Sequence, residues 1–210
     1  MKRLLLVLLP LAFVALGATA YLAGGSDAPA APDAANTADA AETSGALPET
    51  SVYQIDATWT DRHDRPVEWA SLRGRPRLTA MIFTSCGYAC PRTVDELKQV
   101  LAQVPAARRE ALGLVLLSID PERDTAEALQ RFSTHHRLDD AQWTLLRGAE
   151  TDVRTLAAVF GIRYKQEADG QFAHTNLITL LDTEGRVVYR HEGLGADPAP
   201  LLAAIEALPL

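Results

Sequence analysis

The sequence predicts an α/β domain in which a mixed central sheet carries helices on both faces. Three observations lead to this fold class. Two apolar, β-inclined runs occur at residues 77–85 and 112–120, each is followed by a segment with helical periodicity, and the C-terminal third holds extended segments separated by glycine turns. Strands that alternate with helices form parallel pairs, whereas strands joined by tight turns pair antiparallel.

The first strand and helix surround the only two cysteines of the chain. The run RLTAMIFTS (77–85) is largely apolar, which suits a strand buried on both faces. We expect a helix at 91–104, because Pro91 is favoured in a first helical turn and apolar residues then recur at helical spacing. The second buried strand is LGLVLLSID at 112–120.

The alternation of helix and strand continues along the chain. A helix over TAEALQRFSTHHR (125–137) begins with Asp124 or Thr125 as its N-cap. A short strand, QWTLLRG (142–148), precedes the helix ETDVRTLAAVFG, which Gly161 closes in the usual C-terminal position. Strands of this kind line up in parallel when helices connect them.

From residue 162 onward the sequence predicts hairpins and a final helix. The segments IRYKQ, NLITLLD and RVVYRHEG are extended, and turns at Asp169-Gly170 and Glu184-Gly185 pair them as hairpins. A helix over PAPLLAAIEAL (198–208) ends the chain.

Residues 1–23 have the pattern of a signal anchor or a signal peptide. Lys2 and Arg3 precede an uncharged apolar stretch of about 20 residues, long enough to span a bilayer. Ala18-Thr19-Ala20 also forms a small-x-small cleavage site. Both forms place the rest of the chain on the far side of the membrane. We therefore expect an exported protein on the periplasmic side of the inner membrane, anchored by this segment.

Residues 24–50 are rich in Ala, Pro, Ser, Thr and Asp and contain almost no large apolar side chain. Such a segment cannot bury a core, so we expect a disordered tether between the membrane and one domain at 51–210. The formal net charge of −7 and the absence of a Lys/Arg cluster argue against a nucleic-acid partner.

Cys86 and Cys90 lie where the first strand meets its helix. Positions one turn apart are about 6 Å apart at Cα, within range of a disulfide or of one metal ion. A helix N-terminus stabilises the thiolate, which is both the nucleophile and the metal ligand. A stapling disulfide would constrain only a short loop and would contribute little stability. The pair therefore favours thiol redox exchange or metal binding.

A metal site needs a third ligand, which the five histidines could supply. His63 is expected to be solvated in a polar turn, His135 and His136 to lie at a helix end, and His191 to be structural. His174 differs, because it follows a glycine turn and precedes an apolar strand. The end of that strand could face the cysteine loop, which is the loop that carries Cys86 and leads to Cys90. Disulfide exchange enzymes of the thioredoxin type place a proline before such a strand, yet no proline occurs here between Pro121 and Pro198.

These residues resemble the Sco/SenC copper chaperones, which have a thioredoxin-like fold and assist assembly of the copper centre of cytochrome c oxidase. Four stretches match in order and the likeness extends over about 52–208: LRGRPRLTAMIFTSCGYACP, LLSIDPERDT, WTLLRG and AHTNLITLLDTEGRVV. The resemblance implies that Cys86, Cys90 and His174 are copper ligands and that Asp120 lies near the site. Capping or loop fixing is the alternative role for this aspartate.

Two departures from the family pattern concern the surroundings of the site. Ala173 stands where the family often has an Asp before the histidine, and the insert before His174 is short. They bear on which partner is recognised and on how the site is shielded.

The donor set agrees with copper on chemical grounds. Two soft thiolates and one imidazole favour Cu(I), can hold Cu(II) with an added oxygen ligand, and could also bind zinc. Together with this donor set, the resemblance implies a copper metallochaperone that delivers its ion to a respiratory copper enzyme such as a cytochrome c oxidase subunit. The alternative is a thiol-disulfide oxidoreductase that reduces target cysteines before copper insertion, with Cys86 and Cys90 as its redox-active pair. A thiol peroxidase ranks third, because the Thr and Arg setting expected around such a thiolate is not evident.

Overall fold

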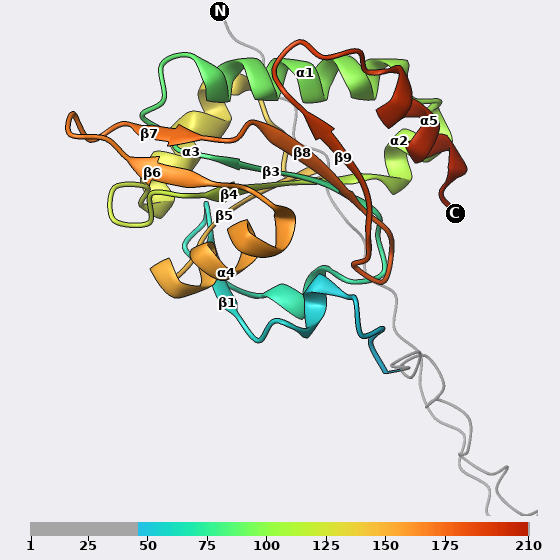
Figure 1. The fold of residues 1–210 in the computed structure, drawn as a ribbon, viewed down its shortest axis with the longest axis horizontal. Coiled ribbons are helices and arrows are strands. Elements are labelled where there is room, and N and C mark those ends of the chain that lie inside the picture. Colours follow the sequence, from blue (N-terminus) through green and yellow to red (C-terminus); the bar gives the residue numbers. More distant parts are fainter. Residues whose placement is uncertain (1–45, 210) are drawn as a thin grey trace, which may run out of the picture. The chain divides into compact units, whose positions relative to one another are not determined.

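The computed structural model describes residues 46–209, which are built around a seven-stranded sheet with the order β2-β1-β5-β4-β3-β8-β9 (Figure 1). A separate two-stranded sheet is formed by β6 and β7. The strands are β1 (Thr58–Asp61), β2 (Pro66–Glu68), β3 (Arg77–Ile82), β4 (Gly113–Ser118), β5 (Trp143–Arg147), β6 (Tyr164–Gln166), β7 (Phe172–His174), β8 (Leu177–Leu181) and β9 (Val187–Glu192).

The predicted mixed sheet is confirmed. β3 pairs parallel with β4, and β4 pairs parallel with β5, whereas β8 is antiparallel to both β3 and β9. Every residue of β3, β4 and β8 is buried, as the apolar runs at 77–85 and 112–120 require. These strands form the centre of the core and set the position of the loops at their ends.

Helices cover both faces of the sheet, and Figure 1 shows α1 and α4 on opposite sides of it. Thr125 caps α3 by accepting the Ala128 N–H, and Gly161 ends α4 with a left-handed φ of +83°. The helices are α1 (Ala89–Gln103), α2 (Ala106–Ala111), α3 (Ala126–His136), α4 (Glu150–Phe160) and α5 (Ala199–Ala207), with short 3-10 turns at Val52–Gln54 and Trp69–Leu72.

The structure corrects one strand pairing. The turn at Asp169-Gly170 does make a hairpin, but its strands are β6 and β7, and β8 is not part of it. Three residues in each strand are too few to give an apolar alternation that could be recognised in the sequence. The strands β1 and β2 and the helix α2 were not predicted either, since they too are short. His174 is therefore the last residue of β7, and β8 begins three positions later.

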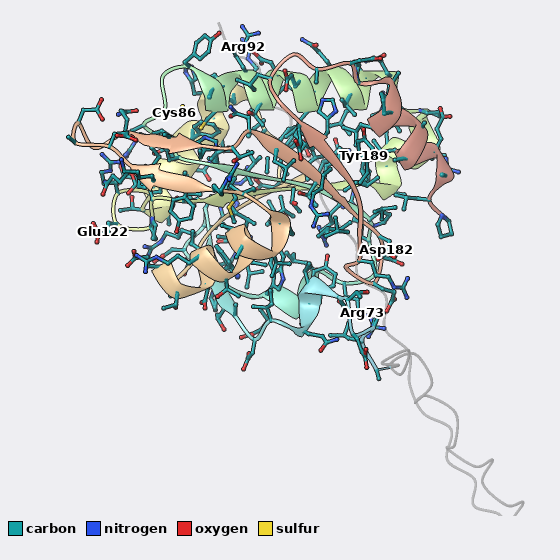
Figure 2. All side chains as sticks on the ribbon, in the orientation of Figure 1. Arg73, Cys86, Arg92, Glu122, Asp182 and Tyr189 are labelled. Carbon is teal, nitrogen blue, oxygen red and sulfur yellow. The ribbon has the colours of Figure 1, made fainter. Side chains whose placement is uncertain are left out.

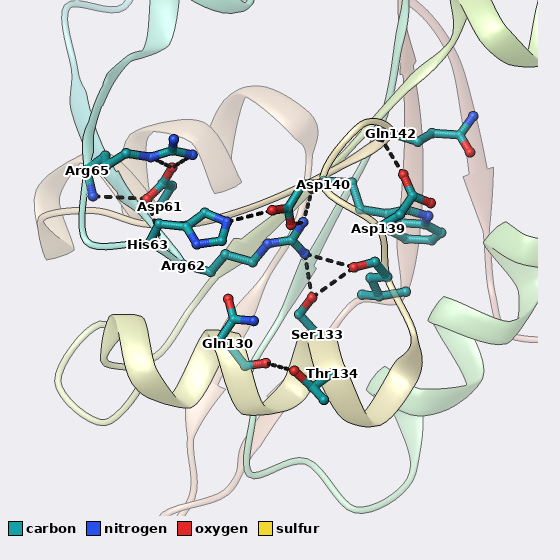
Figure 3. A network of polar contacts seen from close by, with 12 residues as sticks. Asp61, Arg62, His63, Arg65, Gln130, Ser133, Thr134, Asp139, Asp140 and Gln142 are labelled. Carbon is teal, nitrogen blue, oxygen red and sulfur yellow. Dashed lines mark hydrogen bonds and ion pairs between the residues drawn. The ribbon is translucent and has the colours of Figure 1, made fainter. Parts of the chain in front are cut away.

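A polar network connects Arg62, the residue after β1, to α3 and to the segment between α3 and β5 (Figure 3). The Arg62 guanidinium is buried, and it donates to the Ser133 hydroxyl, to the carbonyls of Leu138 and Trp143, and to the Asp140 carboxylate. A buried cation is tolerated only when its donors are paired in this way.

The predicted anchor or signal peptide at 1–23, and most of the predicted tether at 24–50, lie outside the described residues. Between residues 46 and 209, no helix combines the length and the hydrophobicity needed to cross a bilayer.

Candidate metal centre

The two cysteines lie at the junction of β3 and α1, as the sequence predicts. Cys86 is in the loop that leaves the strand, and Cys90 is in the first turn of the helix. Figure 2 shows Cys86 at the end of the molecule where α1 begins, far from Asp182. Both thiols are free, but Cys90 is completely buried whereas Cys86 is partly exposed.

Cys86 is in an environment that stabilises its thiolate. Burial opposes ionisation, but the backbone N–H groups of Cys90, Tyr88 and Ala89 outweigh it and lower the pKa of the Cys86 thiol. The Cys90 N–H lies 3.4 Å from the Cys86 sulfur. The start of α1 therefore prepares this sulfur to act as a nucleophile or as a metal ligand.

Cys90 has the opposite character. Burial strongly raises the pKa of its thiol, and the charges of Cys86 and Asp124 raise it further. The Phe83 N–H, 3.5 Å from the Cys90 sulfur, only partly offsets these effects. In the metal-free reduced protein, the buried Cys90 is a protonated thiol, whereas the partly exposed Cys86 is the reactive one.

His174 has one ring nitrogen, Nε2, whose lone pair is available to coordinate a metal ion. Its Nδ1 lies 3.1 Å from the Thr175 carbonyl oxygen. Because a carbonyl only accepts, Nδ1 carries the hydrogen and the lone pair is on Nε2. This Nε2 is buried and has no hydrogen-bond partner. Burial lowers the pKa of His174, so its imidazole is neutral at neutral pH, which is the form that binds metals.

Phe83 connects the histidine to the cysteine loop. Its ring meets the His174 ring edge-on with centroids 6.1 Å apart, while its backbone N–H donates to Cys90. Within the described part of the chain, no three His, Cys, Asp or Glu side chains are grouped closely enough to hold a metal ion. The structure thus places His174 beside the residue that contacts Cys90, without grouping the three predicted ligands into a set.

Asp120 and Asp124 are both buried in the loop that connects β4 to α3. The Asp120 carboxylate accepts the Arg123 Nε–H at 2.5 Å, so it fixes this loop. Asp124, which sequence reasoning considered only as a cap, accepts hydrogen bonds from the Thr84 N–H at 3.1 Å, the Thr84 hydroxyl at 2.6 Å and the Ser118 hydroxyl at 2.6 Å. Burial raises the pKa of Asp124 despite these donors.

The other four histidines lie in the turn after β1, in α3 and in β9. His63 is exposed, as predicted, and its Nε2 lies 3.0 Å from a carboxylate oxygen of Asp140. His135 and His136 lie in the last turn of α3, as predicted, and they line a groove of about 410 Å³ beside Cys86. His191 is buried in β9.

The fold is thioredoxin-like, and its Cys-x-x-x-Cys pair lies at the junction of β3 and α1, with Phe83 between this pair and the His174 ring. The sequence model of the SCO1/SenC family matches residues 47–209. The chain belongs to this family, and the resemblance noted in its sequence is confirmed.

Individual relatives agree with this assignment. A Stutzerimonas stutzeri protein, whose name proposes that it binds copper, is 30% identical over 141 residues, which cover 65% of this chain and 67% of that protein. ScoI of Bradyrhizobium japonicum, solved with copper bound, is 25% identical with a TM-score of 0.60 over 73% of this chain and 97% of that one. BsSco, a Sco protein in which a disulfide switch was identified, shares the fold, with a TM-score of 0.61 at 21% identity over 73% of this chain and 94% of its own.

Proposed function

We propose that this protein is a copper metallochaperone that binds one copper ion through Cys86, Cys90 and His174 and passes it to another protein by ligand exchange. The observation that carries the proposal is the buried, unpartnered Nε2 of His174 beside Phe83, whose N–H contacts the Cys90 sulfur. A buried nitrogen without a partner is costly, and a metal ion would satisfy it.

The donor set fits copper. Two cysteine sulfurs and one imidazole are soft ligands that suit Cu(I), and an added oxygen donor would allow Cu(II). The Thr175 carbonyl orients the His174 ring in the way that outer-shell carbonyls usually orient metal-binding histidines. Copper bound to the ScoI relative supports the choice of copper over zinc.

The state of the thiols would control loading. Both sulfurs must be reduced and deprotonated to bind the ion, so a Cys86–Cys90 disulfide would be metal-free. Binding would also release the proton of Cys90, whose thiol is protonated in the metal-free protein. Loading therefore depends on the redox state around the protein and on pH.

The copper ion would be delivered to a respiratory enzyme. By family resemblance we propose a copper-accepting subunit of cytochrome c oxidase or of a similar enzyme. We further propose that residues 1–23 place the protein at the periplasmic side of the inner membrane, where such a subunit would be accessible.

A second candidate function is thiol-disulfide exchange, which the contrast between the two thiols favours. The Cys86 thiolate would attack a target disulfide, form a mixed disulfide and release one target thiolate. Cys90 would then lose its proton, attack the Cys86 sulfur and release the second target thiolate, so that two electrons pass to the target. This reaction needs both cysteines but no histidine.

The test is a Cu(I) titration of the reduced protein against a competing chelator, beside a measurement of its disulfide potential. We expect close to one Cu(I) per chain, with sulfur and nitrogen scatterers in X-ray absorption and no binding to the disulfide form. Failure of the reduced wild-type protein to bind copper, together with rapid reduction of a disulfide peptide, would favour the oxidoreductase instead.

A further inference from the structure

The segment 120–124 contacts both of the chain segments that carry the proposed ligands. On one side Asp124 accepts hydrogen bonds from the backbone and the hydroxyl of Thr84, two residues before Cys86. On the other side Arg123 reaches the β6–β7 hairpin that ends at His174. The two contacts come from adjacent residues, so the cysteine loop and the hairpin share one support.

Arg123 makes three interactions, two of which are with the hairpin. Its Nε–H donates to Asp120 at 2.5 Å, which fixes the guanidinium, and an Nη–H donates to the Gly170 carbonyl at the hairpin turn. Its Cζ also lies 5.8 Å from the centre of the Phe172 ring. Gly170 has a φ of +81°, a conformation that glycine adopts without strain.

The hairpin depends on contacts of this kind. It is a two-stranded sheet outside the seven-stranded one, and an isolated hairpin is marginally stable in water. Phe172 packs on Phe83 with ring centroids 5.4 Å apart, and Phe83 in turn contacts His174. The position of the imidazole is thus connected to Arg123 through two aromatic rings.

We propose that Arg123 is a positioning residue for copper binding: it holds the β6–β7 hairpin so that His174 stays beside Phe83, next to the cysteine loop that Asp124 fixes from the adjacent position. This inference rests on the proposed function. It adds that the imidazole half of the site is held by one arginine, although that arginine itself does not touch copper.

The experiment compares Arg123→Gln, Arg123→Lys and Arg186→Gln in the full-length protein. Arg186 is the matched control, because it also pairs with a nearby carboxylate, that of Asp182, and has a similarly exposed side chain. Asp182 lies far from Cys86 (Figure 2). Hydrogen exchange of residues 164–174 is measured in the copper-free protein, and Cu(I) affinity is measured by chelator competition, also in a His174→Ala background.

We expect Arg123→Gln to speed exchange in the hairpin by about 10-fold or more, because charge-assisted hydrogen bonds are lost. Its Cu(I) affinity should fall about 10-fold, as is usual when an outer-shell partner is removed. Arg123→Lys should lie in between, because an ammonium cannot reproduce both fork contacts. Arg186→Gln should match wild type, and the disulfide potential of the cysteines should not change.

The double variant identifies the route of the effect. If Arg123 acts through His174, Arg123→Gln causes no further loss of affinity once His174 is Ala. An equal loss in that background, or unchanged exchange in the hairpin, would overturn the inference. Faster exchange with unchanged copper affinity would overturn it too. A wild-type protein that binds no copper would refute the proposed function, and the exchange data would then decide alone whether Arg123 holds the hairpin.

Discussion

The cysteine loop and the β6–β7 hairpin offer the two halves of the proposed ligand set with different degrees of support. The loop connects a fully buried strand to a long helix, and the Asp124 carboxylate holds it by accepting hydrogen bonds from Thr84. The hairpin lies outside the main sheet and depends on Arg123 and on the contact between Phe172 and Phe83. The thiolate half is therefore positioned by the core itself, whereas the imidazole half is positioned by a few side chains.

The largest test of this contrast is to remove a thiolate. In Cys86→Ser or Cys90→Ser the remaining sulfur and the imidazole cannot hold Cu(I) comparably, because the soft pair is broken. We expect stable binding to be lost in competition with a chelator, a larger effect than the 10- to about 100-fold seen when outer-shell partners are removed. Unchanged stoichiometry in either variant would show that the ligands lie elsewhere.

The two thiols should also differ strongly in reactivity. At pH 8 we expect iodoacetamide to modify Cys86 more than about 100-fold faster than Cys90 in the native protein, since each unit of pKa difference lowers the thiolate fraction tenfold. Because the pKa of Cys86 is lowered, the midpoint of its rate profile should lie below the ordinary value of 9.0. Mass spectrometry of the digested protein measures both rates. Equal rates would mean that the helix start does not distinguish the two sulfurs.

Removing the imidazole should be smaller in effect but more informative. His174→Ala leaves both thiols and the start of α1 in place, so we expect Cu(I) affinity to fall by about 10-fold or more while disulfide exchange stays within a few fold. Circular dichroism checks the fold, and reduction of an oxidised peptide checks the exchange. Retained copper affinity combined with lost reductase activity would reverse the ranking of the two proposed functions.

The smallest expected effect comes from changing Asp124, which holds the cysteine loop through Thr84. Asp124→Asn keeps an oxygen for the Thr84 N–H and offers N–H groups to Ser118, so the free energy of unfolding should fall by only about 1 kcal/mol at neutral pH. In wild type the raised pKa of Asp124 gives a contribution that is present below its ordinary pKa of 3.8 and is lost as pH rises through the folded value.

Denaturant unfolding between pH 4 and 7 measures this difference. The wild-type protein should lose stability over that window relative to Asp124→Asn, which lacks the titrating group. Parallel pH profiles for the two proteins would show that Asp124 is ionised at little cost. A loss of copper binding in this variant would indicate that the loop depends on the negative charge and not only on the hydrogen bonds.

The sequence predicted the parts of the site that local patterns specify. Continuous apolar runs identify buried strands, and the spacing of Cys86 and Cys90 before an amphipathic segment indicates a strand-to-helix junction. The hairpin was assigned to the wrong partner strand because β6 and β7 are short and largely exposed. His174 was therefore identified as a candidate ligand by resemblance and position, but its orientation by the Thr175 carbonyl was not.

The roles of Arg123 and Asp124 could not be predicted for a different reason. In the sequence both residues look like the polar residues that precede a helix, and Thr125 next to them is the actual cap. Their partners lie 47 positions away at Gly170 and 40 positions away at Thr84. Such contacts result from the way the loop ends meet at one edge of the sheet, which residue types alone do not determine.

The unequal exposure of the two sulfurs also has a consequence for oxidative damage. A peroxide that reaches the accessible Cys86 thiolate would convert it to a sulfenic acid and release hydroxide. The Cys90 backbone N–H is 3.4 Å from the Cys86 sulfur, so the neighbouring Cys90 thiol can condense with that sulfenic acid, forming the disulfide and releasing water before a second oxidant arrives. An ordinary reductant reverses a disulfide but not the sulfinic acid that would otherwise form. Because the second sulfur is close but buried, oxidation of Cys86 ends in a disulfide that can be reduced and not in an irreversible sulfinic acid.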